Sequence, residues 1–566
     1  MSVHGSIAYD SYYYSRKKYS KTFPYYLARR DAEDPDYIYL IPQSEESIWS
    51  VSTGWDKNRK VYMEFGIDYN RTFGFHKTTA LILYNQSKYY SPSLQYYVPN
   101  AYQGLVGRLT YEYASRYLAE FNMGYNGTEN FAKGKRFGFF PAVSLGWVIS
   151  EEKFFPKNNI VKYLKVRGSY GEVGNDQIGG DRFLYLPSSY GAASDSGVNK
   201  YNFGLASNPY TSLMIVENKI GNPHLTWEKA KKMNVGVDIN LFNNCLTASF
   251  DIFKEKRNNI LANRSTSPMI IGANLPAYNF GEMENRGWEM DLNFRHHIQD
   301  FHYWARFNYS FARNEIIYMD EVQKRYDYQM TTGRRKNQFF GLIFDGYYNS
   351  WEEINALDRP KSSWSGNQLQ PGDVKYVDVN QDGVIDDYDM VPIGYTPVPE
   401  IIYGFSFGAQ YKGFDFSILF QGADNVSIKY FGLSMWPFAK GEESAKSLIK
   451  ERWTQERYEA GEKITFPRLS LNPNGETDHN YRPSTLWIRD ASYLRLKNLE
   501  VGYTFTGGFV KRLNLNSVRL YFNGSNLFTW TDVVDLDPEA PSRSGNVEIN
   551  TYPLQKVYNI GLNINF

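Results

Sequence analysis

Apolar and polar residues alternate with a period of two along most of this chain. In residues 233–241 every odd position is apolar and every even position is small or polar, and residues 288–295 repeat the alternation. This pattern is typical of β-strands whose two sides face different surroundings. It predicts an all-β protein with roughly 16 strands of about 10–14 residues, which is long for a soluble sheet. The predicted strands are 2–16, 61–73, 77–90, 103–115, 117–129, 138–150, 164–174, 233–241, 246–257, 288–295, 302–313, 401–411, 414–424, 493–505, 517–529 and 558–566.

Short and long connections alternate between these segments. Transmembrane β-barrels have short periplasmic turns and long extracellular loops, so the alternation predicts a barrel whose final strand ends in the periplasm. Residues 17–59 do not fit the pattern and are interpreted as an extracellular loop with short strands of its own. The predicted turns are 74–76, 242–244, 297–299 and 412–413, and the predicted long connections are 91–102, 175–230, 258–286, 314–400, 425–492 and 530–555.

A soluble β-sandwich or propeller would also alternate. Here the apolar face is continuous in Val, Ile, Leu, Phe and Tyr, whereas the other face is rich in Asn, Gly, Ser and Asp. An apolar band facing lipid and a wet lumen explain both faces. The sequence therefore favours a transmembrane antiparallel β-barrel in a Gram-negative outer membrane.

Composition excludes several other classes. The chain has 62 Lys and Arg against 61 Asp and Glu, and a net charge of +1 argues against a nucleic-acid partner. Mean hydropathy is −0.53, and the sequence has no apolar run long enough for a transmembrane helix. The single cysteine, Cys245, excludes a disulfide framework. Aromatic residues make up 17% of the chain, about twice what we expect of an ordinary soluble domain.

Several segments resemble the SusC/RagA family of TonB-linked outer-membrane proteins, and they follow one another in the family's order. The likeness covers essentially all of residues 1–566. The segments that carry it are YNRTFG at 69–74, GRLTY at 107–111, FPAVSLGW at 140–147, ISEEKF at 149–154, GSYGEVGN at 168–175, GNPHLTWEK at 221–229, NFGEMENRGW at 279–288, GDVKY at 372–376 and ASYLRLKN at 491–498.

The resemblance implies a 22-stranded barrel closed by a plug. No signal peptide opens this chain, and no plug-like segment precedes the first predicted strand. An open barrel would leave unpaired strand edges in lipid. We therefore expect residues 1–566 to be the C-terminal part of such a barrel, with the plug and about six strands absent. A truncated gene model, a fragment or one half of a split protein would each explain this.

The family resemblance also implies a function. Its members import oligosaccharides, or in some cases peptides, together with a SusD-like surface lipoprotein and the energising protein TonB. A plugless outer-membrane pore or a surface adhesin on the same scaffold is the alternative. A secreted carbohydrate-active enzyme is a third hypothesis, but the sequence has no GxSxG, HExxH or phosphate-loop motif. We therefore predict a protein that is not an enzyme.

A calcium-loop motif lies within the predicted extracellular loop 314–400. Residues 378–389 fit the pattern D-x-[DN]-x-D-G, whose oxygen ligands suit Ca²⁺. Position 12 is Asp rather than the usual Glu. The prediction is a structural calcium clip, and an acidic Asx-rich turn without metal is the alternative. The candidate ligands are Asp378, Asn380, Asp382, the carbonyl of Val384, Asp386 and Asp389, with Gly383 at the sharp turn.

Aromatic residues that we expect to be exposed are frequent in the predicted loops, and other aromatic residues lie near strand ends. Loop aromatics stack on sugar rings, but they also pack loops together or form interfaces, so the sequence assigns no substrate residue. Tyr303, Tyr309, Tyr403 and Tyr503 fit an interfacial girdle. Phe566 resembles the C-terminal signal for outer-membrane insertion, and it is also a lipid-facing aromatic by its position. The loop candidates are Tyr89, Tyr90, Tyr96, Tyr97, Tyr102, Tyr185, Tyr190, Tyr201, Tyr347, Tyr348, Trp351 and Trp364.

Overall fold

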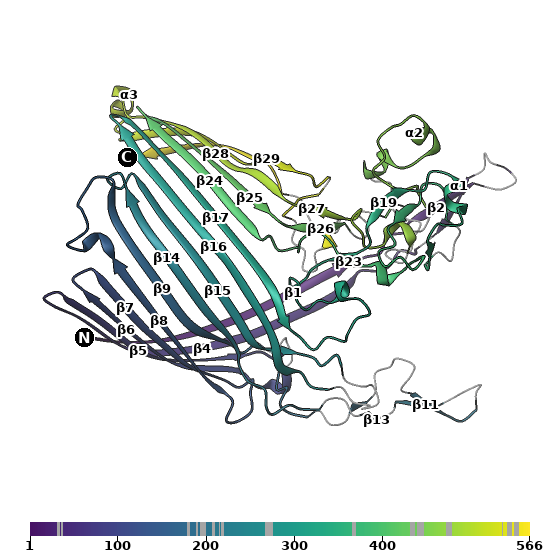
Figure 1. Cartoon of the computed structure of the whole chain (residues 1–566), viewed down its shortest axis with the longest axis horizontal. Coiled ribbons are helices and arrows are strands. Elements are labelled where there is room, and N and C mark those ends of the chain that lie inside the picture. Colours follow the sequence, from purple (N-terminus) through teal and green to yellow (C-terminus); the bar gives the residue numbers. More distant parts are fainter. Residues whose placement is uncertain are drawn as a thin grey trace.

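A computed structural model gives the fold of the chain (Figure 1). Among the residues it describes, no helix is long and apolar enough to span a membrane. It describes residues 1–566 apart from 31–33, 35–37, 43, 178–181, 188–190, 193–199, 206–209, 214, 217–219, 267–274, 365–368, 431–435, 438–446, 471–477, 535, 540–545 and 548–553.

One antiparallel sheet of 16 strands dominates the fold, and its strands lie side by side in chain order (Figure 1). Every one of the predicted strands overlaps a strand of this sheet, so the all-β prediction is confirmed. The strands are β1 (Ser2–Ser20), β4 (Ser50–Phe73), β5 (His76–Tyr90), β6 (Asn100–Tyr113), β7 (Tyr117–Thr128), β8 (Phe137–Val148), β9 (Val161–Asn175), β14 (Glu228–Leu241), β15 (Leu246–Ala262), β16 (Tyr278–Ile298), β17 (Phe301–Tyr318), β24 (Ile401–Tyr411), β25 (Phe414–Asp424), β28 (Tyr493–Phe505), β29 (Ser517–Thr531) and β31 (Val557–Asn565).

The first hairpin is longer than the alternation predicts. β1 and β4 remain paired up to Ser20 opposite Ser50, so much of the segment 17–59 is strand rather than loop. Beyond Tyr12 the two sides of these strands no longer differ in polarity, which is why the alternation ends early. The predicted short strands are present as the hairpin of β2 (Tyr26–Arg30) and β3 (Ile38–Pro42).

Connections sort to the two ends of the sheet (Figure 1). Both chain termini and the tight turns lie at one end, here called the turn end, and the long connections lie at the other, the loop end. At Lys412 and Gly413 both φ angles are positive, as in the two-residue turns that join antiparallel strands. A Cβ atom on Gly413 would lie 2.8 Å from the carbonyl oxygen of Thr504, so this turn requires glycine.

The sheet has one apolar and one polar face. Along β15, Phe250 and Ile252 point to the apolar face, while Ser249 and Asp251 point to the polar face. Side chains of the apolar face are widely exposed; Leu145, for example, is 64% exposed. So large an exposed apolar surface indicates contact with lipid or another apolar partner. Within the described chain, β1 pairs only with β4, and β31 pairs only with β29.

Short elements fill the connections. The described part of the chain has three helices of five residues, namely α1 (Trp351–Asn355), α2 (Gln455–Glu459) and α3 (Gly508–Arg512), the last at the turn end (Figure 1). The short strands are β10 (Gly191–Ala192), β11 (Lys200–Phe203), β12 (Tyr210–Leu213), β13 (Ile215–Val216), β18 (Phe340–Gly341), β19 (Phe344–Tyr347), β20 (Lys361–Ser362), β21 (Val374–Tyr376), β22 (Val384–Ile385), β23 (Val391–Pro392), β26 (Ser427–Tyr430), β27 (Ile488–Asp490) and β30 (Asn546–Val547).

Candidate functional site

Three long connections fold together at the loop end. We call this unit the loop cap; it comprises the described residues of 319–400, 425–492 and 532–539. All three segments contribute to one buried apolar cluster, so the cap has a core of its own. At its centre Phe466 packs against Trp487 with ring centroids 5.5 Å apart. The core residues are Leu342, Tyr347, Val374, Tyr376, Ile385, Val426, Ile428, Tyr430, Trp453, Phe466, Tyr481, Leu486, Trp487, Ala491 and Val533.

A buried polar cluster joins two of these segments. The carboxylate of Asp373 accepts a hydrogen bond from Nδ2 of Asn480 at 2.8 Å and forms an ion pair with Nε of Arg468 at 2.6 Å. The side-chain oxygen of Asn480 accepts a hydrogen bond from the backbone N–H of Val374 at 2.9 Å. The backbone carbonyl of Asn480 accepts one from the indole N–H of Trp487 at 2.8 Å. Because these buried groups are paired, they fix how the segments meet instead of destabilising the cap.

His479 is a partly buried imidazole in the same cluster. Its Nε2 lies 2.8 Å from the carbonyl oxygen of Val374, and its Nδ1 lies 3.2 Å from Oγ of Ser362. A neutral ring that donates from Nε2 and accepts at Nδ1 satisfies both contacts. Burial lowers the pKa of His479, and this outweighs the opposing effects of the Val374 carbonyl and the nearby carboxylates. The charged side chains around the ring are Asp373, Asp478 and Arg482.

The predicted calcium loop forms a tight turn within the loop cap. Oδ1 of Asp378 accepts from the backbone N–H of Gln381 at 2.7 Å, and its Oδ2 accepts from that of Gly383 at 2.8 Å. Gly383 has φ of 81°, as the sharp turn in the motif requires. Asp389 is fully buried and accepts hydrogen bonds from the backbone of 379, 380 and 386. Burial raises the pKa of Asp389 more than these hydrogen bonds lower it.

The geometry of this loop supports the turn more directly than the metal. Within the described residues, no group of three or more His, Cys, Asp or Glu side chains is placed to hold a metal ion. Asn380 and Asp382 bond to each other, with Nδ2 donating to Oδ2 at 3.1 Å, and Asp386 accepts from the backbone N–H of Tyr388 at 2.7 Å. The oxygen donors suit Ca²⁺ chemically, but they are directed at N–H groups. Calcium binding stays a prediction.

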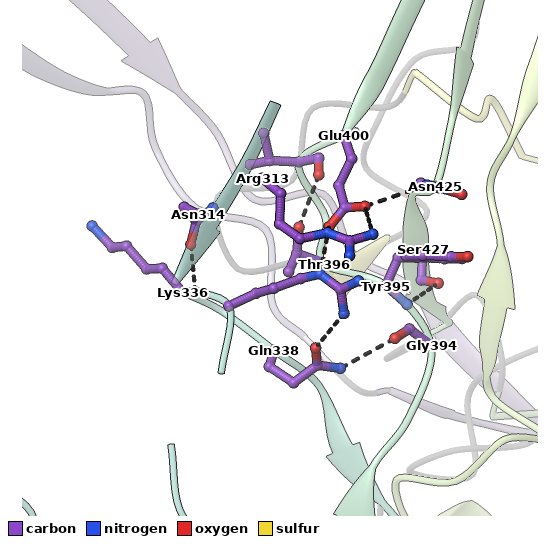
Figure 2. A network of polar contacts seen from close by, with 12 residues as sticks. Arg313, Asn314, Lys336, Gln338, Gly394, Tyr395, Thr396, Glu400, Asn425 and Ser427 are labelled. Atoms are coloured by element: carbon purple, nitrogen blue, oxygen red, sulfur yellow. Dashed lines mark hydrogen bonds and ion pairs between the residues drawn. The ribbon is translucent and has the colours of Figure 1, made fainter. Parts of the chain in front are cut away.

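A second polar network anchors the loop cap to the sheet (Figure 2). The buried carboxylate of Glu400 accepts from Nε and Nη2 of Arg313 at 3.0 and 2.8 Å, from Arg335, and from Nδ2 of Asn425 at 3.3 Å. Burial opposes ionisation, but the two guanidinium groups hold the pKa of Glu400 below its usual range. Gln338 continues the network by donating to the carbonyl of Gly394 at 3.2 Å. The ends of β17, β24 and β25 are thereby joined to the cap.

A cavity of about 810 Å³ opens at the loop end, on the polar face of β4 to β9. We call it the mouth pocket. Its wall includes the phenol rings of Tyr89 and Tyr102, and Tyr102 donates a hydrogen bond to Oδ1 of Asn126 at 2.9 Å. Lys60 and Asp176 present a cation and an anion to the pocket, and neither makes an ion pair with a described residue. Such a wall suits a polar ligand with stacking surfaces.

One side of the mouth pocket is held in place by an ion pair. Nη2 of Arg182 contacts Oε1 of Glu129 at 2.7 Å, and Arg182 also donates to the backbone carbonyl of Pro99 at 3.2 Å. Oε2 of Glu129 accepts from the backbone N–H of Ala101 at 2.9 Å. These contacts connect three segments that are far apart in the sequence, so the pocket is supported by fixed neighbours.

The polar face carries further ion pairs towards the turn end. Arg167 of β9 contacts Asp238 of β14 at 3.1 Å and Asp251 of β15 at 2.7 Å. Arg519 of β29 contacts Oε1 of Glu500 at 2.6 Å and also pairs with Asp415. A cavity of about 420 Å³ lies beside the first cluster, between side chains of β5 to β14. Charged pairs of this kind suit a water-filled lumen.

The loop aromatics divide into exposed and buried groups. Tyr96, Tyr97 and Trp351 are exposed, as predicted. Tyr347 and Tyr348 are buried in the loop cap, so the interpretation of these two as exposed loop residues is wrong. The guanidinium of Arg482 lies over the ring of Trp364, with its carbon atom 4.0 Å from the ring centroid. Tyr185 packs edge-on against Phe183, and Tyr90 lies under Arg59. Tyr190 and the side chain of Tyr201 lie outside the described residues.

The predicted girdle and terminal residues lie on the apolar face. Tyr309 is directly opposite Tyr403, and Tyr503 is opposite Phe414. Phe566 is exposed at the turn end, and its carbonyl accepts a hydrogen bond from Asn516 at 2.6 Å. Its role as an insertion signal stays a prediction.

Sequence reasoning did not single out the charged residues of the mouth pocket. Lys60 lies on β4, Asp176 follows β9, and Glu129 and Arg182 belong to two connections. Only the pairing of six strands brings them to one cavity, and the two tyrosines were the sole signal. The alternation could have placed Lys60 on the polar face, since it lies directly opposite Tyr89.

The long antiparallel strands, the exposed apolar face and the ion-paired polar face define an outer-membrane β-barrel of the receptor and transporter type. Comparison with known families agrees with this class. The family described as "TonB dependent receptor-like, beta-barrel" matches residues 3–527. The chain belongs to this family, whose members are outer-membrane receptors rather than enzymes.

Within this family, the chain is similar to several individual proteins and solved structures. TonB-dependent receptor P3 of Formosa agariphila is 28% identical over 479 residues, which cover 81% of this chain and 45% of that protein. TonB-dependent receptor SusC of Bacteroides thetaiotaomicron is 28% identical over 477 residues, or 83% of this chain and 44% of that protein. A structure of the RagAB peptide importer in the 'open-open' state has a TM-score of 0.70 at 19% identity, covering 99% of this chain and 62% of that one. The resemblance to the SusC/RagA family is confirmed, and the chain spans about half the length of the curated relatives it matches.

Proposed function

We propose that this chain forms the wall of an outer-membrane importer that takes up polar oligomers in a TonB-dependent manner. The observation that carries the proposal is the family's long-stranded sheet, whose polar face bears a pocket at the loop end. TonB, driven by the proton gradient of the inner membrane, supplies the energy. In this arrangement the loop end is extracellular, and Phe566 lies on the periplasmic side.

The substrate we propose is an oligosaccharide, with a peptide as the second candidate. The rings of Tyr89 and Tyr102 offer stacking surfaces for sugars. Lys60 and Asp176, which form no ion pair within the described chain, favour a peptide, because the two ends of a peptide carry opposite charges. RagAB is a peptide importer, and the similarity of this chain to it is in keeping with the second candidate.

Pocket variants distinguish the two substrates. Tyr102→Ala should weaken binding of either oligomer about two- to tenfold through lost stacking. The matched control is Tyr125→Ala, since Tyr125 lies on the apolar face and stacks on Phe137. The double variant K60Q/D176N should weaken binding of tripeptides and leave neutral oligosaccharides unchanged. Calorimetry with tripeptide and with maltooligosaccharide mixtures measures both. If neither mixture binds, or if Y125A loses as much as Y102A, the pocket assignment is wrong.

The proposed partner is a SusD-like surface lipoprotein that covers the loop end. The similarity to SusC and to RagAB supports such a partner. Tyr96 and Tyr97 are exposed at the loop end, where a covering protein would find aromatic contact sites. Affinity purification of the native protein from outer membranes should recover one lipoprotein in equimolar amount. Recovery of the protein alone would argue against this partner.

A plugless pore or adhesin predicts a different electrical behaviour. An importer whose lumen is closed should be nearly silent in planar bilayers, whereas a plugless pore should conduct steadily. Steady conductance by the native protein would therefore replace the importer with the pore.

We also propose that the loop of residues 378–389 binds Ca²⁺ as a structural clip. The support is the spacing of its oxygen donors and the turn at Gly383. Calcium should raise the thermal stability of the native protein, and D378N/D382N should abolish this increase. The matched control is Asp327→Asn, an exposed acid elsewhere in the loop cap. A protein that neither binds nor responds to millimolar Ca²⁺ would show that the loop is an Asx-rich turn.

A further inference from the structure

A row of three cations crosses three neighbouring strands on the apolar side of the sheet. Lys254 of β15 lies directly opposite Arg286 of β16, and Arg286 lies directly opposite Arg313 of β17. Residues placed in this way have Cβ atoms about 4.5–5.5 Å apart, so like charges repel one another. We call these three residues the cation row. Its arrangement costs stability unless an anion lies among the three side chains.

The cation row marks the loop-end border of the apolar band. Two positions nearer the turn end, the same strands carry Ile252, Trp288 and Phe311, which again lie opposite one another. Trp288 stacks on Tyr309 with ring centroids 4.7 Å apart. Aromatic residues of a membrane barrel gather where hydrocarbon meets headgroups. The cation row therefore lies at the level of the lipid headgroups.

The protein itself only partly neutralises this row. Nζ of Lys254 lies 2.9 Å from Oε2 of Glu284, and Arg313 shares Glu400 with a second arginine. Arg286 is exposed, and its guanidinium makes no ion pair or hydrogen bond with any residue that the structure describes. The central member of the row thus retains its full set of donors.

The next row outward carries charges of both signs, because Lys256 lies directly opposite Glu284 of β16, which in turn lies opposite Glu315 of β17. Lys231 of β14 lies directly opposite Lys256 of β15. Lys256 pairs with Glu282 at 2.9 Å, and Lys231 has only a long contact of 4.0 Å to Glu172. Within the described residues of these strands, the excess of positive charge is therefore confined to the cation row.

We propose that the cation row binds the phosphate group of a lipid in the outer leaflet. A phosphomonoester at Arg286 would accept charge-assisted hydrogen bonds from its guanidinium and offset the repulsion by Lys254 and Arg313. The acyl chains would continue along Ile252 and Trp288. This continuity with the apolar band selects a lipid over free phosphate. The inference rests on the membrane location of the family and is independent of the transported substrate.

Lipid binding can be measured by native mass spectrometry on the protein extracted in detergent from outer membranes. The probes are monophosphorylated lipid A, the same lipid after phosphatase treatment, and inorganic phosphate. We expect the phosphorylated lipid to bind at least about tenfold more tightly than the treated lipid. K254Q/R286Q should weaken binding about thirtyfold, since each cation at a membrane surface contributes about a factor of five.

Lys88→Gln is the matched control for lost positive charge. Lys88 is exposed on the same face of β5, where its cross-strand neighbours are Val61 and Ala101. This variant should bind lipid like the unmodified protein. The single variant R286Q, expected to lose about fivefold, accompanies the double variant in case the latter does not insert. Heat-modifiable gel migration reports insertion for each.

Three results would overturn the proposal. The first is equal binding of the phosphorylated and the phosphatase-treated lipid. The second is an equal loss of binding in K88Q and R286Q. The third is displacement of the lipid by inorganic phosphate at the same concentration, which would define a site for a free anion.

Discussion

Replacing Glu400 by glutamine tests how strongly the loop cap is tied to the sheet. The carboxylate is buried between Arg313 and Arg335, and Asn425 also donates to it. Glutamine keeps the shape, but it removes the charge and directs an amide N–H₂ group at guanidinium donors. Removing one partner of a buried ion pair costs about 3–5 kcal/mol. The side chains of Arg313 and Arg335 are 41% and 24% exposed, so water solvates the unpaired guanidinium groups and reduces this cost. We therefore expect E400Q to lower the stability of the cap by about 2–3 kcal/mol.

The effect should be local to the cap and its rim. Amide exchange in residues 331–340 and 393–400 should accelerate roughly 30- to 150-fold, because 1.4 kcal/mol corresponds to a factor of ten. Strands β8 and β9 should be unchanged. The control is Glu462→Gln, which removes a half-exposed carboxylate paired with Arg457 and should change stability by less than about 0.5 kcal/mol. If E400Q and E462Q exchange alike, the ion pair does not hold the cap.

The same carboxylate predicts a pH dependence. Its pKa is lower in the folded protein than in an unfolded chain, so its stabilisation is complete above about pH 4.3. The stabilisation is then lost as the pH falls through the lower, folded pKa. Exchange of 393–400 at pH 6 and at pH 3, corrected for the intrinsic rate, measures this loss. Unchanged protection at pH 3 would contradict it.

Three further perturbations have defined outcomes. Phe466→Ala should destabilise the loop cap by about 3–5 kcal/mol, because the ring is 2% exposed, and protease cleavage within the cap would report it. The contribution of the neutral His479 to the stability of the loop cap should be complete above about pH 6.5 and be lost as the pH falls below this value. The reason is that burial lowers the pKa of His479, so that the opened cap binds the proton more tightly. Amide exchange of the cap at about pH 7.5 and about pH 5.5 checks this. Gly413→Ala should destabilise the β24–β25 hairpin by about 1–3 kcal/mol, as its φ is 93°, and a lower urea midpoint would show it.

The strands could be predicted because the two faces of the sheet meet different solvents. From Met233 to Leu241 lipid and water impose opposite demands on alternate residues, and the structure has β14 there. Outside the membrane this difference disappears. The parts of β1 and β4 nearest the loop end accordingly have no alternation of apolar and polar residues. The sequence therefore predicts a loop where the hairpin in fact continues to Ser20 and Ser50.

The loop cap and the mouth pocket could not be predicted in the same way. Tyr347 and Tyr348 are surrounded by polar residues in the sequence, and they are buried only because other connections fold over them. Lys60 and Asp176 line the same cavity because of the register of six strands, which no local sequence pattern encodes. The turn at 378–389 is the opposite case, because its hydrogen bonds are local and the motif describes them.

Uptake measured in cells shows directly whether the protein is a TonB-dependent importer. Cells that carry the complete gene, and cells that lack it, are given fluorescent oligosaccharides or peptides with and without a protonophore. For such an importer we expect uptake that requires the gene and stops when the proton gradient is dissipated, because TonB then no longer supplies energy. Gene-dependent uptake that continues unchanged with the protonophore would contradict it and identify a passive pore.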